Sequence, residues 1–410
     1  MHLRSLTCAV ACTLAFTLSA TALDWPQWRG PKRDDIQPET GLLKQWPEGG
    51  PKRAWMCENA GMGYAGFSVV GGKLFTLGAR DAREQLLAFD AATGKELWAA
   101  PISDVLSNGW GDGPRGTPAV DGDRVYALSG MGALACVKVA DGKVLWTHTM
   151  EELGGKRPGW GFTESPTVDG AQVLVTPGGS SGAVAALDKM TGKTLWQSKD
   201  FTDGAQYSSL VPATINKIPQ YVQITMQSVV GIDAKNGSVV WKSEWPGRTA
   251  VIPTPIVRGD FVFVTAGYGV GCKLLQISPE NSASEVYRNG NMENHHGGVV
   301  LVGDHLYGHS KQGWTCLDFE TGEPKWVEKA KLEKGAIAYA DGRLYLLGEK
   351  TGQVVLLEPS PAGWNEKGRF TLEPQTTIRN PKGAIWTHPV ISNGRLYLRD
   401  QDHIYCYSVK

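Results

Sequence analysis

Short apolar stretches alternate with polar turn residues along most of the chain, and one such arrangement recurs. Residues 90–98 read Asp-Ala-Ala-Thr-Gly-Lys-Glu-Leu-Trp, a polar turn that leads into a strand-like segment ending in tryptophan. The same plan returns in residues 138–146, 188–196, 233–241 and 318–326. Recurrence at roughly 40 to 50 residues is typical of propellers and solenoids, in which one supersecondary unit is repeated.

A second pattern, two short alternating apolar strands around an Asp-Gly, Asn-Gly or Gly-Gly turn, precedes the first. Residues 117–126, Thr-Pro-Ala-Val-Asp-Gly-Asp-Arg-Val-Tyr, are typical of such a β-hairpin. One hairpin and one turn-tryptophan segment make four strands. Counting hairpins predicts eight units, although the pattern is blurred between residues 207 and 222. We place the units at residues 61–101, 110–150, 160–200, 205–246, 249–290, 294–330, 334–373 and 385–410.

The last unit, residues 385–410, has only three strands before the chain ends. Residues 52–57 are expected to supply the fourth strand, because Trp55 stands where other units have Trp98 or Trp146. Such an exchange joins the two ends of the ring and removes open sheet edges. The sequence therefore predicts an all-β fold: an eight-bladed propeller of four-stranded antiparallel blades, closed by an N-terminal strand that completes the last blade.

The two faces of this propeller differ in sequence. The Asp-Gly and Thr-Gly turns fall on one regular face, and the loops between units and between second and third strands fall on the other. That second face, called the irregular face below, carries segments that differ from unit to unit. Varied loops on a regular scaffold are where function usually resides. The irregular segments are residues 109–115, 159–164, 203–207, 291–296 and 385–388.

The N-terminus is read as a secretory signal over residues 1–22. Basic residues precede an apolar run from Leu6 to Leu18, and residues 20–22 have the small-x-small form of a cleavage site. A buried helix is the alternative. A lipoprotein anchor at Cys12 is disfavoured because the apolar run continues past it. We expect an exported protein, periplasmic or secreted, with no transmembrane segment in the mature chain.

Residues 23–51 are rich in proline and glycine and have no clear period. We expect an extended arm laid on the surface of the propeller, which itself spans residues 52–410. Trp25, Trp28 and Trp46 indicate that the arm docks, since disordered tails are usually poor in aromatic residues.

The charge balance and the cysteine positions limit the expected partners and disulfides. The chain has 41 Lys and Arg against 41 Asp and Glu, so no net field attracts nucleic acid. Cys136 and Cys316 fall at the position where other units have a small residue, which predicts core packing instead of disulfides. Cys406 occupies the same position, but it could meet Cys57 in the closing unit. A disulfide between these two residues is therefore an open alternative.

The repeat at residues 188–196 resembles that of the pyrroloquinoline quinone (PQQ)-type propellers, and the resemblance covers residues 52–410. Five of the eight units keep the turn and the tryptophan, whereas Tyr287 and Phe370 replace the tryptophan in two others. The family includes quinoprotein alcohol dehydrogenases, polyvinyl-alcohol dehydrogenase-like proteins and the propeller scaffold of the outer-membrane β-barrel assembly machinery. Residues 25–31 also resemble the leader of exported bacterial propellers of this kind. The resemblance therefore implies a fold but several functions.

A dehydrogenase of this family implies a quinone (PQQ), a calcium ion held by oxygen ligands, an Asp base and a route for electrons. Aromatic and polar residues near the starts of the inner strands are candidates for a pocket in the central channel. They equally suit the wet, hydrogen-bonded lining that any propeller channel has. The candidates are Trp110, Arg115, Trp160, Glu164, Tyr207, Arg248, His295, Lys334, Trp386 and His388.

Several departures weigh against catalysis. The chain has neither the adjacent-cysteine pair of the alcohol dehydrogenases nor a haem-attachment motif. Glu164 is the one carboxylate placed near the axis, while calcium prefers six to eight oxygens, and no Asp matches the catalytic motif. Successive strand residues point to opposite faces, so His295 and His296 do not both face a metal shared with His388. We expect no metal site, and the catalytic residues stay unassigned.

The sequence thus favours a binding or scaffolding module that acts through its irregular face. A PQQ-dependent alcohol or sugar dehydrogenase, with calcium as second cofactor, is the alternative. The expected partner is a protein or a small-molecule or carbohydrate ligand, and the expected state is a monomer.

Overall fold

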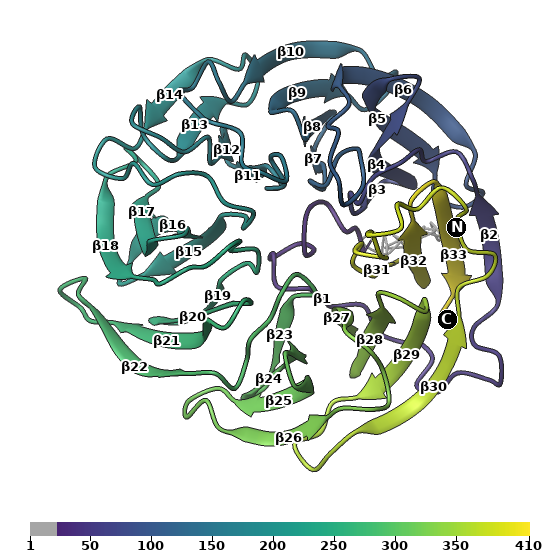
Figure 1. Ribbon diagram of the computed structural model, residues 1–410. Coiled ribbons are helices and arrows are strands. Elements are labelled where there is room, and N and C mark those ends of the chain that lie inside the picture. Colours follow the sequence, from purple (N-terminus) through teal and green to yellow (C-terminus); the bar gives the residue numbers. More distant parts are fainter. Residues whose placement is uncertain (1–22) are drawn as a thin grey trace, which may run out of the picture.

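The computed structural model describes residues 23–410, which form 33 strands and no helix. Eight blades of four antiparallel strands each stand around one axis (Figure 1), and one of these sheets gains a fifth strand from the N-terminal arm. The prediction of an eight-bladed propeller is confirmed. The proposed signal, residues 1–22, lies outside the described residues. Within residues 23–410 no helix has the length and apolar character needed to cross a membrane.

Each blade runs from an inner strand at the axis to an outer strand at the rim. Blades 1 and 2 are β3 (Ser68–Val70), β4 (Lys73–Arg80), β5 (Arg83–Asp90), β6 (Glu96–Asp104), then β7 (Ala119–Asp121), β8 (Arg124–Leu128), β9 (Ala133–Lys138) and β10 (Val144–Thr149). Blades 3 and 4 are β11 (Thr167–Asp169), β12 (Gln172–Val175), β13 (Ala185–Asp188), β14 (Thr194–Gln197), then β15 (Val211–Ile215), β16 (Ile218–Ile224), β17 (Ser228–Asp233) and β18 (Val239–Glu244).

The second half of the ring follows the same plan. Blades 5 and 6 are β19 (Ile256–Arg258), β20 (Phe261–Ala266), β21 (Gly271–Ile277), β22 (Ala283–Asn289), then β23 (Val299–Val302), β24 (His305–Ser310), β25 (Gly313–Asp318) and β26 (Pro324–Glu328). Blade 7 is β27 (Gly335–Ala340), β28 (Arg343–Gly348), β29 (Gln353–Glu358) and β30 (Asn365–Thr371), and blade 8 contains β31 (Val390–Ser392), β32 (Arg395–Asp400) and β33 (His403–Ser408).

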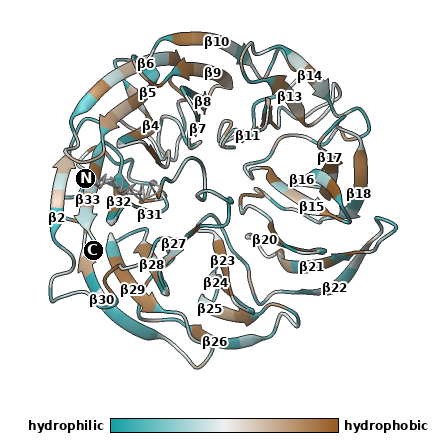
Figure 2. Ribbon diagram, turned by 180° about the vertical axis from the view of Figure 1, so that it is seen from behind, coloured by the Kyte–Doolittle hydropathy of each residue, from teal (hydrophilic) through white to brown (hydrophobic). Residues whose placement is uncertain are grey.

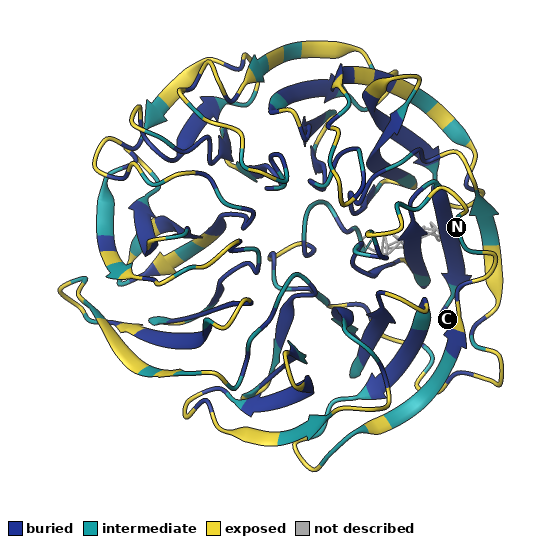
Figure 3. Cartoon of the chain, viewed as in Figure 1, coloured by how far each residue is buried: buried dark blue, intermediate teal, exposed yellow. Residues whose placement is uncertain are grey.

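The core lies between neighbouring blades. The inner and middle strands are apolar and buried, whereas the outer strands carry many exposed or partly buried residues (Figures 2 and 3). Between blades 1 and 2, for example, Phe75 and Leu77 pack in one cluster with Val125 and Val137. Because each cluster joins two blades, removing one blade would expose the core of both neighbours.

The repeated tryptophan fastens each blade to the next. Trp98 at the end of blade 1 donates its indole N–H to Val139 O in blade 2 at 3.0 Å. A Cβ at Gly142 would lie 2.7 Å from the Trp98 ring, and Gly142 has φ +74°, so glycine suits both the turn and the contact. Trp146 repeats the arrangement with Lys189 O at 3.2 Å. The repeated motif is therefore structural.

The ring closes as the sequence predicts. Strand β2 (Arg53–Cys57) pairs antiparallel with β33, with Trp55 opposite Cys406 and Cys57 opposite Ile404. Trp55 donates to Ala91 O of blade 1 at 3.1 Å, so it repeats the tryptophan contact across the closure. Cys57 and Cys406 are both free thiols.

Replacing Trp55 by alanine is expected to lower the free energy of unfolding by about 3 kcal/mol, because the variant loses a half-buried indole at the strand that joins the chain ends. Urea denaturation followed by circular dichroism measures the change. Leu97→Ala, an exposed position on the outer strand of blade 1, serves as control. Equal midpoints for the two variants would contradict the closure.

The N-terminal arm departs from its prediction: residues 24–37 do not lie on the surface but enter the central channel (Figure 1). Trp25 exchanges backbone hydrogen bonds with Val69 of blade 1, and Pro26 O accepts from Val120 N of blade 2. Strand β1 (Ile36–Gln37) then pairs in parallel with β27 of blade 7. The arm enters and leaves on the regular face, and its bend forms a plug, residues 24–37, inside the ring.

Two buried arginines hold this plug. Arg29 donates to Thr254 O (3.3 Å) and Val299 O (2.6 Å) in blades 5 and 6, and its Nε lies 2.7 Å from Asp35 Oδ2. Arg33 donates to Ser165 O (3.0 Å) in blade 3. Sequence reasoning placed the arm outside because proline-rich segments without a period usually follow the surface. Here charged side chains satisfy the inward-facing carbonyl groups of the channel instead.

Candidate functional site

A cavity of about 780 Å³ lies at the axis on the irregular face. Its walls are the residues that precede the inner strands and the loops between second and third strands. Its floor is formed by Trp28 and Arg29 of the plug. The propeller therefore offers one deep hollow whose base is part of its own N-terminal arm.

The structure brings eight of the ten candidate residues together around this cavity. The remaining two, Glu164 and Arg248, do not line it. The eight are Trp110, Arg115, Trp160, Tyr207, His295, Lys334, Trp386 and His388. They come from different blades but share a position just before an inner strand. Because the inner strands converge on the axis, this position predicts which residues line the cavity.

Glu164 and Arg248 differ for physical reasons. Glu164 is buried, and its two carboxylate oxygens accept from the N–H (2.5 Å) and the hydroxyl (2.9 Å) of Thr176. Burial raises the pKa of Glu164 to about 7, although these hydrogen bonds act in the opposite direction. Arg248 is exposed near Gly269. Glu164 thus stabilises blade 3 from within and is not a ligand-facing carboxylate.

Sequence reasoning missed several residues of the cavity. Trp28 was assigned to a surface arm, and Tyr268 lies on a glycine-flanked loop that breaks the repeat. Glu349 follows the second strand of blade 7, in the same class of loop as Tyr268, and only comparison of these loops between units could have found it. The missed residues that matter most below are Trp28, Tyr64, Tyr268, His296, Glu349, Lys350, Arg379 and Lys382.

Aromatic side chains form much of the wall. The rings of Tyr64 and Trp386 lie 4.8 Å apart between centroids, and those of Trp160 and Tyr207 lie 5.8 Å apart. Trp110 is 47% exposed, and its carbonyl oxygen accepts from the Tyr64 hydroxyl at 2.8 Å. Flat apolar faces are thus available both inside the cavity and at its mouth.

Most of the charged side chains in the cavity wall are cationic. Glu349 is the sole carboxylate among the described lining residues, against six cationic side chains. Of these six, Arg29, Lys334 and Arg379 pair with Asp35, Glu349 and Asp400 respectively. The three cations without a carboxylate partner in the described chain are Arg115, Lys350 and Lys382.

Arg115 is held rigidly. Its guanidinium donates to Gly113 O (2.7 Å) and Gly111 O (2.8 Å) and lies 5.1 Å from the centre of the Tyr64 ring. Burial lowers the pKa of Arg115, while Tyr64 and nearby carboxylates act to raise it. A partly desolvated guanidinium of this kind attracts an anion more strongly than an exposed one.

One wall carries a continuous series of polar contacts, called the wall network below: Tyr268, His295, Lys334, Glu349 and His296. Tyr268 Oη lies 2.7 Å from His295 Nε2, and Lys334 Nζ lies 3.0 Å from His295 Nδ1. Glu349 Oε1 is 3.1 Å from Lys334 Nζ, and its Oε2 is 3.1 Å from His296 Nε2. Blades 5, 6 and 7 are thereby connected across the cavity wall.

The network has a defined charge state. Burial acts to raise the pKa of Glu349, but hydrogen bonding and charge interaction with His296 and Lys334 outweigh it and bring the pKa to about 2. Burial, His296 and Lys334 together lower the pKa of His295 to about 3. Burial lowers the pKa of His296 as well. At neutral pH the Glu349 carboxylate is therefore ionised and the imidazoles of His295 and His296 are neutral.

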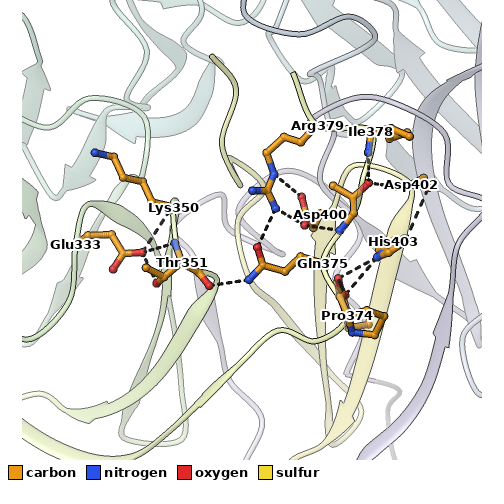
Figure 4. A network of polar contacts seen from close by, with 12 residues as sticks. Glu333, Lys350, Thr351, Pro374, Gln375, Ile378, Arg379, Asp400, Asp402 and His403 are labelled. Atoms are coloured by element: carbon orange, nitrogen blue, oxygen red, sulfur yellow. Dashed lines mark hydrogen bonds and ion pairs between the residues drawn. The ribbon is translucent and has the colours of Figure 1, made fainter. Parts of the chain in front are cut away.

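The loop between blades 7 and 8 contributes Arg379 and Lys382 to the cavity lining. Figure 4 shows polar contacts around Arg379 and around Lys350 and Thr351 of blade 7. Arg379 pairs with Asp400, and Gln375 Nε2 donates to Thr351 O at 2.7 Å. Glu333 accepts from the backbone N–H groups of Lys350 (3.3 Å) and Thr351 (2.9 Å). These contacts fix the backbone at Lys350, whose side chain lines the cavity.

His388 joins the cavity to the plug. Its Nε2 donates to His296 O at 2.8 Å, its Nδ1 lies 3.8 Å from Asp35 Oδ2, and its ring is 4.5 Å from that of Trp28. Burial lowers the pKa of His388 to about 3. The imidazole is therefore neutral, and it positions the floor against the wall network.

The donor set does not fit a calcium-bound quinone. Within residues 23–410 no three His, Cys, Asp or Glu side chains are placed to hold a metal ion. The one lining carboxylate, Glu349, is already engaged by Lys334 and His296, whereas calcium takes six to eight oxygen ligands.

Comparison with known proteins assigns the family. The model of the PQQ_2 family, described as outer membrane protein assembly factor BamB, matches residues 82–328, more than half of the chain. The chain belongs to this family. No curated protein sequence matches it significantly.

Solved structures agree with the fold. The quinohemoprotein alcohol dehydrogenase of Comamonas testosteroni superposes with a TM-score of 0.61 at 11% identity, over 94% of this chain and 80% of that one. Quinohemoprotein alcohol dehydrogenase ADHIIG of Pseudomonas putida HK5 gives 0.62 at 12% identity, with the same coverage. BamB of Moraxella catarrhalis gives 0.44 at 17% identity, over 90% and 94%. At these identities the two superpositions with a TM-score above 0.6 concern the fold alone.

Proposed function

We propose that this protein is an exported binding propeller that holds an acidic carbohydrate in its axial cavity. The observation that carries the proposal is the combination of seven aromatic side chains with three cations lacking a carboxylate partner, in one hollow of about 780 Å³. Pockets of this volume match small ligands or short oligomers.

Two properties of the wall favour an acidic sugar. The apolar C–H faces of a pyranose ring pack on flat aromatic rings such as Trp110, Trp160 and Trp386. A carboxylate on the same ring finds Arg115, Lys350 or Lys382 at the wall or mouth. An acidic peptide supplies the charge without the flat apolar faces, and a neutral sugar supplies the faces without the charge.

The second candidate is a PQQ-dependent dehydrogenase, to which the aromatic and cationic wall is also suited. The lack of a catalytic Asp and of a calcium donor set disfavours it. The third candidate function is a scaffolding role through the irregular face. Such a role does not require an axial cavity of this kind.

Tryptophan fluorescence tests the proposal, because Trp28, Trp110, Trp160 and Trp386 all line the cavity. Oligogalacturonate is expected to change the emission in a saturable manner, and neutral cello-oligosaccharide and oligoglutamate are expected to bind at least tenfold more weakly. Saturable binding of PQQ, with or without calcium, in place of the acidic sugar would support the dehydrogenase. Tighter binding of oligoglutamate would overturn the carbohydrate assignment.

A further inference from the structure

The axial cavity has a closed floor. The plug, residues 24–37, makes hydrogen bonds to blades 1, 2, 3, 5, 6, 7 and 8 from inside the ring. Arg29, Arg33 and Asp35 are each at most 1% exposed, so no water-filled gap surrounds these side chains. The space beneath Trp28 measures about 10 Å³, which is roughly room for a single water molecule. A ligand in the cavity therefore has no passage through the ring to the regular face.

The side wall of the cavity is closed as well. Each segment that enters a blade contributes a lining residue, and these are Tyr64, Trp110, Trp160, Tyr207, Thr254, His295, Lys334 and Trp386. Hydrogen bonds of 2.8 to 3.4 Å join neighbouring parts of the wall: Tyr64 to Trp110, Asn108 to Gly159, Trp160 to Tyr207, Tyr207 to Val251, Ile385 to Glu349 and Thr387 to Tyr64. The wall network joins blades 5, 6 and 7. Within residues 23–410 the cavity therefore has one opening, on the irregular face.

A cavity with one opening limits how a sugar chain can bind. A volume of about 780 Å³ holds a ligand of drug size, so only a short stretch of a sugar chain enters. The interior of such a chain would need a second exit or a sharp reversal inside the cavity. Pyranose rings are rigid and rotation about glycosidic bonds is restricted, so a reversal in this space is disfavoured. The end of a chain needs neither.

We propose that the cavity takes the end of an acidic polysaccharide chain, with the terminal uronate on the floor against Trp28. This inference rests on the proposed function, because it needs an acidic sugar in the cavity. It adds that the protein recognises the terminus of the sugar chain and not its interior.

Trp28 offers a positioned ring at the floor. Its indole N–H donates to Thr254 Oγ1 at 3.0 Å, and its ring lies 4.5 Å from that of His388. The side chain is nevertheless only partly buried and lines the cavity. A ring held in this way packs on the apolar C–H face of a terminal pyranose with little further loss of side-chain entropy.

The three cations without a carboxylate partner differ in exposure. Arg115 is partly buried, whereas Lys350 and Lys382 are exposed. The carboxylate of a residue inside the cavity suits Arg115, whose guanidinium is fixed by the carbonyl groups of Gly111 and Gly113. The carboxylates of the residues that follow it, which remain in contact with water, suit the two lysines. The charge of the wall thus favours an end that carries consecutive uronates.

Calorimetric titration with oligogalacturonates blocked at their ends tests the proposal. A sugar chain that carries a bulky group at both ends is expected to bind roughly tenfold more weakly than the unmodified chain of the same length, because neither terminus can enter. Chains blocked at one end are the controls, and at least one of them should keep the unmodified affinity.

Equal affinity of the doubly blocked and the unmodified chain would overturn the proposal and leave the binding function. Loss of affinity in both singly blocked chains would overturn it as well, since one free end should be sufficient. Absence of binding to every unmodified oligomer would overturn the proposed function together with this inference, so the two failures are distinguishable.

The length of the sugar chain gives a second readout. Affinity should rise with length only until the cavity is filled. The number of protein molecules bound per sugar chain should stay constant from short oligomers to polygalacturonate. Binding to the interior would instead increase that number in proportion to length, and this result would contradict the proposal.

A substitution at the floor tests whether the terminal residue reaches it. Trp28→Ala is expected to weaken binding of unmodified oligogalacturonate roughly tenfold, whereas Trp28→Phe keeps a flat ring and should retain most of the affinity. Trp364→Ala is the matched control, because Trp364 is also partly buried but packs at the outer strands, 6.3 Å from the Trp326 ring. Thermal melting confirms that each variant is folded. Wild-type affinity in folded Trp28→Ala would show that the sugar stops short of the floor and would overturn the proposal.

Discussion

Replacing Arg399 by methionine is expected to lower the free energy of unfolding by about 4 kcal/mol. Arg399 is fully buried in β32 and joins blade 8 to blade 1. Its guanidinium donates to Ala65 O (3.0 Å), Leu77 O (2.7 Å) and the Thr76 hydroxyl (2.8 Å). Methionine keeps much of the apolar length but leaves these buried acceptors without a donor, and each such loss typically costs about 1 to 3 kcal/mol.

Arg395→Met is the matched control for this prediction. It lies in the same strand and is only partly buried, and its side chain makes no hydrogen bond or ion pair among the described residues. Chemical denaturation of both variants measures the difference. A midpoint for Arg399→Met equal to that of Arg395→Met would show that β2 alone, and not this arginine, closes the ring.

Replacing Arg29 by methionine is expected to lower the free energy of unfolding by about 3 to 5 kcal/mol, because it removes one member of a buried ion pair. The variant leaves Asp35 and the carbonyl groups of Thr254 and Val299 inside the channel without their donor. We also expect faster tryptic cleavage at Lys32 and Arg33, since the plug is no longer held. Lys32→Met, an exposed change in the same arm, should leave stability unchanged.

The Arg29 deficit should depend on pH. Burial raises the pKa of Asp35 from 3.8 to about 7, against the opposing effect of Arg29. A carboxyl group whose pKa is raised in the folded state contributes stability below its unfolded pKa and loses it as pH rises through the folded value. Without Arg29 the folded pKa rises further, so the loss extends to higher pH. The deficit of Arg29→Met should therefore grow above about pH 7, and a constant deficit would contradict this ionisation.

The repeat made the ring predictable. The copies at residues 90–98 and 188–196 fixed the spacing of the blades, and Trp55 identified the closing strand because it matched the tryptophan of those copies. The plug was not predictable in this way. Trp28 and Arg29 have no counterpart in the repeats, and their partners are backbone carbonyl groups, which leave no pattern in the sequence.

The site was predictable only by position. Residues just before inner strands converge on the axis, so Trp110, Lys334 and Trp386 could be assigned to the cavity from their place in the repeat. Glu164 occupies a similar place but turns inward to Thr176, and Tyr268 and Glu349 come from the other class of loop. The direction of the side chain and the geometry of the loop determine whether each of these three residues lines the cavity. Neither follows from the spacing of the repeats.

The central claim, that unpaired positive charge and aromatic faces hold an acidic sugar in the axial cavity, is tested most directly by calorimetric titration of oligogalacturonate at low and high ionic strength. Wild-type protein is compared with the Lys350→Ala/Lys382→Ala double variant. We expect the double variant to bind about tenfold more weakly at low salt, with a smaller difference at high salt because exposed charges are screened. Equal affinity of the two proteins at low salt, or equal affinity of the wild type for neutral cello-oligosaccharide, would contradict the account.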